Sequence, residues 1–250
     1  MAHKTLINGT SYEITGGRTL VNGTGYAIGK GKTLVSGTAY EVGFGTAIGS
    51  LPLGTTLSFN VNGVTKNWLI VHQGLPSSAY DSSCNGTWLL LDDIYTKKAW
   101  DSSDNNYANS DIHSYLNNDF LNLLDSNLKS VIKQVKIPYT NGTGTGGTVS
   151  TGSNGLSTKV FLLSCAEMDF SGLSYANVEG AVLDYFKGAA DSVRIGKYNG
   201  SAIYWYLRSP VNTDTSKVWF VAPNGTAGNG GRGSSRGIRP AIILPSDYEI

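Results

Sequence analysis

The sequence contains little charge and no long apolar run. Only 15% of its 250 residues are charged and the formal net charge is +1, so the charge does not favour binding to nucleic acid or to anionic lipid. No apolar stretch approaches the roughly 18 residues that a membrane-spanning helix needs, and residues 1–6 lack the apolar segment of a signal peptide. We therefore expect synthesis in the cytoplasm and no insertion into a membrane.

Histidine and recognisable catalytic motifs are scarce as well. His3, His72 and His113 are far apart, and none has a second ligand at the spacing of a zinc site. The acidic segments 92–93 and 101–105 do not have the spacing of an EF-hand, and an Asx-rich turn is favoured over a calcium site. Since no nucleophile elbow stands out, we expect no cofactor and no enzyme, although a pair of glycosidase-like carboxylates stays open.

The two cysteines, Cys84 and Cys165, do not make a disulfide framework. Cys165 follows an apolar, strand-like run at residues 160–164. A buried free thiol is therefore favoured over a disulfide at this position.

Glycine, in contrast, is abundant. The chain has 32 glycines, well above the usual share of about 7%, which indicates many tight turns in a β-rich chain. The first part of the chain repeats with a period of fourteen residues, over 4–14, 18–28 and 32–42. Each repeat places Asn-Gly or Ser-Gly between two strand-like runs, a pattern typical of a two-residue β-hairpin.

Such hairpins bury little core on their own. They must stack on each other, on other copies of the chain or on a partner. We predict that residues 1–46 form a β-hairpin repeat stalk, and a short sheet folded onto the main domain is the alternative.

Residues 47–250 have the composition of a globular domain. The apolar patterns predict strands over 56–61, 66–72, 87–91 and 159–164, and helices over 110–124, 127–135 and 177–187. Ser110 can cap the first of these helices. Residues 140–157 are rich in Gly, Thr and Ser, so an exposed loop is expected there.

Four motifs occur in order within this domain. They are Ser-Asp-Ile-His-Ser-Tyr-Leu-Asn at 110–117, Lys-Val-Phe-Leu-Leu-Ser at 159–164, Trp-Tyr-Leu-Arg-Ser-Pro at 205–210 and Gly-Ile-Arg-Pro-Ala at 237–241. This set resembles an uncharacterised domain family of gut bacteria and their phages over about residues 50–245, and the repeats resemble those at the start of phage structural proteins. The domain family looks related to the C-type-lectin-like fold. The resemblance implies an α+β fold, with a C-type-lectin-like domain at 47–250 preceded by the short β-hairpin repeat stalk at 1–46.

The same fold is shared by formylglycine-generating enzymes and by the variable proteins of diversity-generating retroelements. In the variable proteins, fixed scaffold residues alternate with positions that are mutated to change the binding specificity. The scaffold residues implied here are Trp205, 207–210, Val218, Val221, Gly225 and 237–241. The ligand-binding residues implied by the resemblance are Tyr204, Tyr206, Asn212, Thr213, Asp214, Thr215, Ser216, Trp219, Asn224, Thr226, Asn229, Arg232, Ser234 and Ser235.

These residue types agree with a binding surface, because Tyr and Trp give large rigid contacts while Asn and Ser give adaptable hydrogen bonds. The alternative is a turn-rich sheet whose polar residues only face water. Arg208 and Arg239 are interpreted as scaffold ion pairs or as donors to carbonyls, and contact with an anionic ligand is the alternative.

The resemblance implies a non-enzymatic, phage-associated receptor-binding protein of the virion, on the tail or the particle surface. It would bind a cell-surface protein or glycan through residues 204–235, attach to a phage structural protein through residues 1–46, and form a homo-oligomer, with a trimer favoured. Diversification of 204–235 by a retroelement stays open, as do two other functions. One is a structural tail decoration protein without a specific ligand. The other is a formylglycine-generating-enzyme-like enzyme, whose copper-holding cysteine pair is not matched by Cys84 and Cys165.

Overall fold

The computed structural model describes residues 3–7, 10–14, 18–21, 24–27, 30–35, 38–43, 45–141, 146–170 and 172–250. The chain divides into two compact units. The first contains Met1–Ile48 and Glu249–Ile250, and the second contains Gly49–Tyr248.

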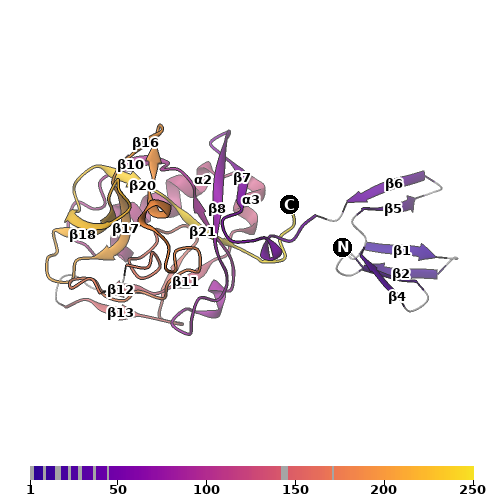
Figure 1. The fold of residues 1–250 in the computed structure, drawn as a ribbon, viewed down its shortest axis with the longest axis horizontal. Coiled ribbons are helices and arrows are strands. Elements are labelled where there is room, and N and C mark those ends of the chain that lie inside the picture. The colour runs from indigo at the N-terminus through magenta and orange to yellow at the C-terminus, as the bar shows by residue number, and fades with distance from the viewer. Residues whose placement is uncertain are drawn as a thin grey trace. The chain divides into compact units, whose positions relative to one another are not determined.

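Three antiparallel hairpins belong to the first unit (Figure 1). The paired strands are β1 (His3–Ile7) with β2 (Thr10–Ile14), β3 (Arg18–Val21) with β4 (Thr24–Ala27), and β5 (Lys30–Val35) with β6 (Thr38–Gly43). One hairpin corresponds to each sequence repeat, which confirms the strands expected from the period. The Asn-Gly and Ser-Gly turns lie outside the described residues, and the function of the repeats as a stalk stays a prediction.

The second unit contains a four-stranded antiparallel sheet in the order β21-β9-β8-β7. Its strands are β7 (Thr56–Val61), β8 (Val64–Gly74), β9 (Gly86–Leu91) and β21 (Ala241–Leu244). The first three confirm strands predicted from the sequence, and Asn62 and Gly63 make the turn between β7 and β8 with φ values of 52° and 73°. Every residue of β9 is buried, so the centre of this sheet is covered on both faces.

A helical run follows, made of α1 (Asp111–Tyr115), a π-helical turn (Leu116–Phe120) and α2 (Leu121–Leu123). The Ser110 side chain accepts a hydrogen bond from the His113 backbone amide at 3.2 Å, as the predicted N-cap should. A second short helix, α3 (Ser126–Val131), comes next. Both predicted helices are confirmed here, although α3 ends early because Val135 already belongs to a strand.

Two other predicted elements are wrong. Residues 177–187 form turns instead of a helix, and Gly180 within them has a φ of 97°, which a helix does not allow. Within residues 159–164 only Phe161 pairs, in a single bridge with Ala241. Leu183, Phe186 and the apolar side chains of 159–164 are buried because the chain crosses the core there, and burial alone does not distinguish an irregular segment from a regular one.

A five-stranded sheet is built mainly from the C-terminal segment. Its order is β10-β20-β17-β18-β19. The strands are β10 (Thr96–Lys98), β17 (Trp205–Pro210), β18 (Lys217–Val221), β19 (Ala227–Gly231) and β20 (Arg236–Ile238). β17 and β20 run parallel, and the other neighbours are antiparallel.

Short elements complete the structure. β11 (Val135–Ile137) pairs with β14 (Leu156–Thr158), β12 (Tyr139–Asn141) with β13 (Thr148–Ser150), and β15 (Lys197–Tyr198) with β16 (Ser201–Ala202). Single 3-10 turns occupy Ile48–Ser50, Ser82–Cys84, Tyr107–Asn109 and Asp191–Arg194. The expectation of one exposed loop at 140–157 is therefore wrong for its described part, which contains strands and the buried Thr140. Residues 142–145 lie outside the described part.

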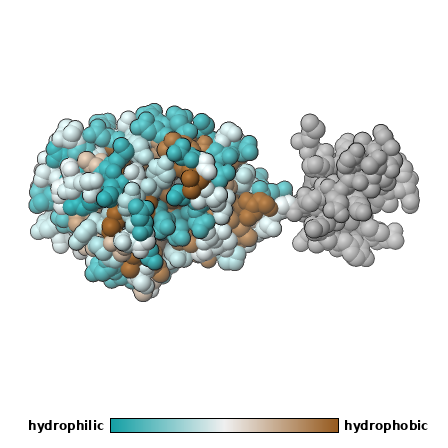
Figure 2. Space-filling model, turned by 90° about the horizontal axis from the view of Figure 1, so that it is seen from above, coloured by the Kyte–Doolittle hydropathy of each residue, from teal (hydrophilic) through white to brown (hydrophobic). Residues whose placement is uncertain are grey.

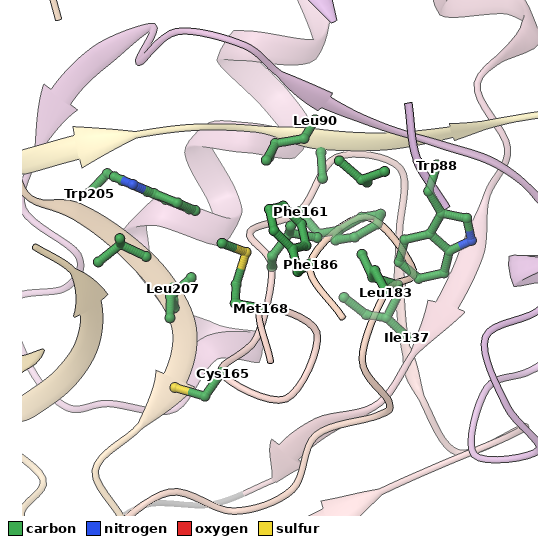
Figure 3. Packing of buried hydrophobic residues seen from close by; sticks show 14 of the residues in the cluster. Trp88, Leu90, Ile137, Phe161, Cys165, Met168, Leu183, Phe186, Trp205 and Leu207 are labelled. Atoms are coloured by element: carbon green, nitrogen blue, oxygen red, sulfur yellow. The ribbon is translucent and has the colours of Figure 1, made fainter. Parts of the chain in front are cut away.

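One hydrophobic core joins residues of both large sheets (Figure 3). Trp88 and Leu90 reach it from β9, and Trp205 and Leu207 reach it from β17. The rings of Trp88 and Phe161 pack edge to face, with their centres 5.6 Å apart. The second unit is thus a β-rich domain with few short helices. Figure 2 shows that its visible surface is largely hydrophilic or neutral, with small separate apolar patches.

No helix among the described residues is both long and apolar enough to cross a membrane.

Candidate functional site

The strand register brings most of the predicted ligand-binding residues to one end of the five-stranded sheet. Lys217 at the start of β18 pairs with Gly231 at the end of β19, so the loops 211–216 and 232–235 lie at the same end. The two loops are joined by a hydrogen bond of 3.0 Å from the backbone amide of Arg232 to the carbonyl of Ser216. The predicted residues that meet here are Asn212, Thr213, Asp214, Thr215, Ser216, Arg232, Ser234 and Ser235.

Buried and half-buried polar groups set the conformation of these loops. The buried Asn105 amide donates to the carbonyls of Val211, Asp214 and Lys217 at 3.0, 3.0 and 2.8 Å. Arg232 donates from its guanidinium to the carbonyls of residues 102 and 215 at 3.1 and 3.4 Å. The framework is therefore fixed from inside, while the side chains at 213, 215, 216, 234 and 235 are exposed.

Asp214 shows how the first loop is stabilised locally. Its carboxylate accepts hydrogen bonds from the backbone and hydroxyl of Ser216, and it forms a 2.9 Å ion pair with Lys217. The hydrogen bonds from Ser216 and the charge of Lys217 lower the pKa of this carboxyl group. The side chain of Asp214 therefore shapes the turn that presents its neighbours.

Six predicted residues do not join this group, and four of them are exposed or half-buried elsewhere in the unit. Asn224 and Thr226 lie in the turn at the opposite end of the strands, where the Asn224 side chain accepts the Thr226 hydroxyl at 2.8 Å. Asn229 is exposed on β19, the edge strand. Tyr204 precedes β17 and is 48% exposed.

Tyr206 and Trp219 correct the prediction most clearly, because both are buried. Trp219 lies in the core with Trp205, and its indole donates to the carbonyl of Tyr175 at 3.3 Å. The Tyr206 hydroxyl donates to the carbonyl of Ser234 at 2.6 Å. The expectation that these two rings are exposed contacts is wrong. Strands β17 and β18 are buried on both faces, so alternation along them does not separate surface from scaffold.

An aromatic and arginine cluster that was not predicted from the sequence lies on the face of this sheet opposite the hydrophobic core. The Arg236 guanidinium lies 4.4 Å from the ring centre of Phe220 and 5.3 Å from that of Tyr206. Tyr204 packs edge-on against Phe220, with ring centres 5.2 Å apart. A Cβ atom at Gly228 would lie 2.5 Å from the Phe220 ring, so this glycine lets the ring lie against β19. The alternating glycines of β19, opposite Phe220, were the signal available in the sequence.

An apolar cavity of about 490 Å³ adjoins the polar loops. Its lining includes Cys165, Phe170, Leu173, Ala176, Val178 and Ala181. The Asn212 side chain donates to that of Asn177 at 3.3 Å, and its backbone amide donates to the carbonyl of Tyr175 at 2.9 Å. Because Tyr175 and Val178 are 51% and 75% exposed, polar loop and apolar rim form neighbouring parts of one surface.

Arg208 belongs to the scaffold, which confirms the favoured interpretation of this residue. Both terminal nitrogens bond the carboxylate of Glu167 at 2.6 Å, and the pair is fully buried. A second buried carboxylate, Glu179, accepts the backbone amide of Thr140 at 2.6 Å and the hydroxyl of Ser209. Burial raises the pKa of Glu179, partly offset by Arg208 and these hydrogen bonds. No ligand can reach these groups without unfolding the core.

Both cysteines are buried free thiols, which confirms the favoured interpretation. Burial raises the pKa of Cys84 to about 12 and also raises that of Cys165. Neither thiol is therefore prepared to act as a nucleophile. Asp101 makes an Asx-type turn, in which one carboxylate oxygen accepts the backbone amides of Ser103 and Asp104 at 2.6 and 2.9 Å. Across the described ranges, no three His, Cys, Asp or Glu side chains come together as a metal site would require.

Comparison with known proteins adds one match. Residues 85–246 match the model of a family described as a domain of unknown function, DUF6273. No curated protein and no solved structure matches the chain. The match covers more than half of the sequence and includes the helical run, both large sheets in part and the loops of the candidate surface. The chain therefore belongs to the DUF6273 family.

Proposed function

We propose that the protein is a non-enzymatic ligand-binding protein. Its binding surface consists of the loops 211–216 and 232–235 and of the rim of the apolar cavity, with Tyr175 and Val178. The observation that carries this proposal is the contrast between the exposed hydroxyl and amide side chains of the loops and the buried groups that fix their backbone.

This combination suits recognition for physical reasons. Short hydroxyl and amide side chains on a rigid frame form hydrogen bonds without a large loss of entropy on binding. A cavity of about 490 Å³ falls within the range of small-ligand sites, roughly 300–1,000 Å³, and can take an apolar group of the partner. Loops held by a scaffold are also where binding residues are commonly placed.

The motif resemblance extends the proposal. It supports a C-type-lectin-like fold for the second unit, with which a β-rich domain with few short helices is compatible. It also supports a receptor-binding role on a phage particle, with a cell-surface protein or glycan as the ligand and with the three hairpins as the attachment to a phage structural protein.

Binding is tested with a glycan array and with intact bacterial cells. Val178→Asp and Thr215→Arg change exposed side chains on the proposed surface, so we expect each to weaken saturable binding about tenfold or more without lowering the melting temperature. Ser201→Arg is the matched control for Thr215→Arg, because it adds the same positive charge on β16, which lies next to the opposite end of β17. If all three variants bound as tightly as the native protein, this surface would be ruled out. If the native protein bound neither glycans nor cells, a structural decoration protein would be favoured.

Diversification of the loop residues by a retroelement is a separate proposal with its own test. Adenine-directed mutagenesis of Asn codons yields Tyr, Asp, Ser, Thr, Gly and Arg, and of these all but Gly occur among the predicted positions. We expect a near-copy of the segment coding for 204–235 close to a reverse transcriptase gene, with differences only at adenines of the copy. A genome without such a copy would defeat diversification and leave ligand binding untouched.

A further inference from the structure

A second cavity, of about 430 Å³, lies elsewhere in the same unit, between the four-stranded sheet and the segment 192–197. Its charged lining residues are Asp92, Asp93, Lys197 and Arg239. Its lining also includes the apolar or aromatic side chains of Leu69, Tyr185, Val193 and Ile195. The cavity therefore offers both signs of charge beside an apolar wall.

Arg239 is the most unusual of these groups, because it is only 2% exposed and its partners are incomplete. Its Nε donates to the carbonyl of Leu91 at 2.7 Å, and its guanidinium lies 5.1 Å from the ring centre of Trp205. Its Nη2 is 3.8 Å from the nearest oxygen of Asp92, which is too long for a hydrogen bond. Its buried Nη1 has no hydrogen-bond acceptor among the described residues.

The electrostatics agree with this incomplete pairing. Burial lowers the pKa of Arg239 to about 10, and the charges of Asp92 and Asp93 offset that effect only in part. A buried guanidinium with a free donor is costly in free energy, and a carboxylate that reached it would supply the missing acceptor. The interpretation of Arg239 as a scaffold donor to a carbonyl is therefore confirmed for Nε, while Nη1 has no acceptor among the described residues.

The mixture of charges decides what kind of ligand fits. A simple anion drawn to Arg239 and Lys197 would also meet the carboxylates of Asp92 and Asp93, and a simple cation would meet the arginine. A molecule with a carboxylate beside an ammonium group satisfies both pairs. The apolar wall suits a hydrocarbon side chain on that molecule.

We propose that this cavity binds an amino-acid-like zwitterion with an apolar side chain, either free or as part of a larger ligand. Arg239 and Lys197 bind its carboxylate, and Asp92 and Asp93 bind its ammonium group. The site uses none of the residues of the surface at 211–216, so it is an additional activity of the domain.

The full-length protein is tested by NMR titration with three matched probes. L-Leucine carries both charged groups, 4-methylpentanoate lacks the ammonium group, and 3-methylbutylamine lacks the carboxylate. We expect leucine to bind about tenfold more tightly than either analogue. The indole signal of Trp205, which lies against Arg239, should shift on binding, whereas that of Trp100, which donates to the Leu207 carbonyl, should not.

Variants of exposed charges locate the site without disturbing the core. Lys197→Gln and Asp93→Asn should each weaken leucine binding about fivefold, while Lys187→Gln, an exposed lysine outside the cavity, should leave it unchanged. Equal affinity for leucine and 4-methylpentanoate would overturn the proposal. So would unaltered binding in Lys197→Gln and Asp93→Asn, or no saturable shift at about 10 mM leucine.

Discussion

At the scale of single residues, two buried carboxylates lie near one buried guanidinium, that of Arg208. Glu167 and Glu179 are both buried, and Arg208 forms its close ion pair with Glu167 alone. The Tyr80 hydroxyl adds a further hydrogen bond to Glu167 at 2.9 Å. Glu179 receives neutral donors instead, from Ser209 and Thr140. A carboxylate without a full counter-charge in the core favours its protonated form.

This imbalance predicts an unusual pH dependence. Burial places the pKa of Glu179 in the folded protein above its value in the unfolded chain. At a pH between these two values, the folded protein keeps the proton on Glu179 and the unfolded chain has lost it. The contribution of Glu179 to stability therefore falls as the pH rises through that window. Glu179→Gln removes the titration and keeps a similar shape, so the variant should gain stability relative to the native protein between about pH 5 and about pH 8.

Denaturant unfolding at the two pH values measures this difference. Asp119→Asn, a change of an exposed carboxylate on the helical run, is the control and should show no such trend. A Glu179→Gln variant whose stability relative to the native protein is the same at both pH values would contradict the assignment.

At the scale of elements, local turns and helix caps are predicted better from the sequence than the exposure of side chains on the strands β17 and β18. The Asn62–Gly63 turn and the Ser110 cap follow from local chemistry, because each needs a particular residue type at one position. The burial of Tyr206 and Trp219 could not be predicted from local chemistry. Their exposure depends on what covers the sheet, which includes Arg236 and the loop at 231–234, and these contacts arise from tertiary structure.

The exposure of the side chains in the loop 211–216 was predicted better, for a related reason. Residues 213, 215 and 216 lie in a turn, where polar side chains face solvent whatever covers the sheet. The apolar cavity and the Arg239 site could not be predicted, because their walls come from distant segments that only the fold brings together.

Two glycines test how much the turns of the second unit depend on their surroundings. Gly225 has a φ of +87°, and a Cβ atom there would lie 1.9 Å from the carbonyl oxygen of Asp191. Gly63 has a φ of +73° with open space around it. We expect Gly63→Ala to cost about 1 kcal/mol and Gly225→Ala more than about 3 kcal/mol, since the second also displaces the backbone at Asp191. Thermal unfolding measures both, and equal losses would show that the 222–226 turn shifts freely.

At the scale of the whole molecule, the second unit holds both large sheets and the hydrophobic core that joins them. A chain that begins at Gly49 should therefore fold by itself and keep its melting temperature within a few degrees, about the effect of a small change in stability. If the hairpins are an assembly module, the full chain should self-associate while the shortened chain is monomeric.

Circular dichroism and light scattering of the two chains test these expectations. A shortened chain that fails to fold would show that the second unit depends on residues 1–48. A monomeric full-length chain would remove the oligomer from the proposal.

The burial of the cysteine thiols provides a chemical probe of how often the core opens. Cys84 and Cys165 are the only two cysteines, and burial keeps both thiols protonated at neutral pH. Cys165 lines the apolar cavity, whereas Cys84 has no exposed surface. A thiol-modifying reagent can therefore react with Cys84 only in molecules that have opened, and the labelling rate of Cys84 reports how often the core opens under native conditions.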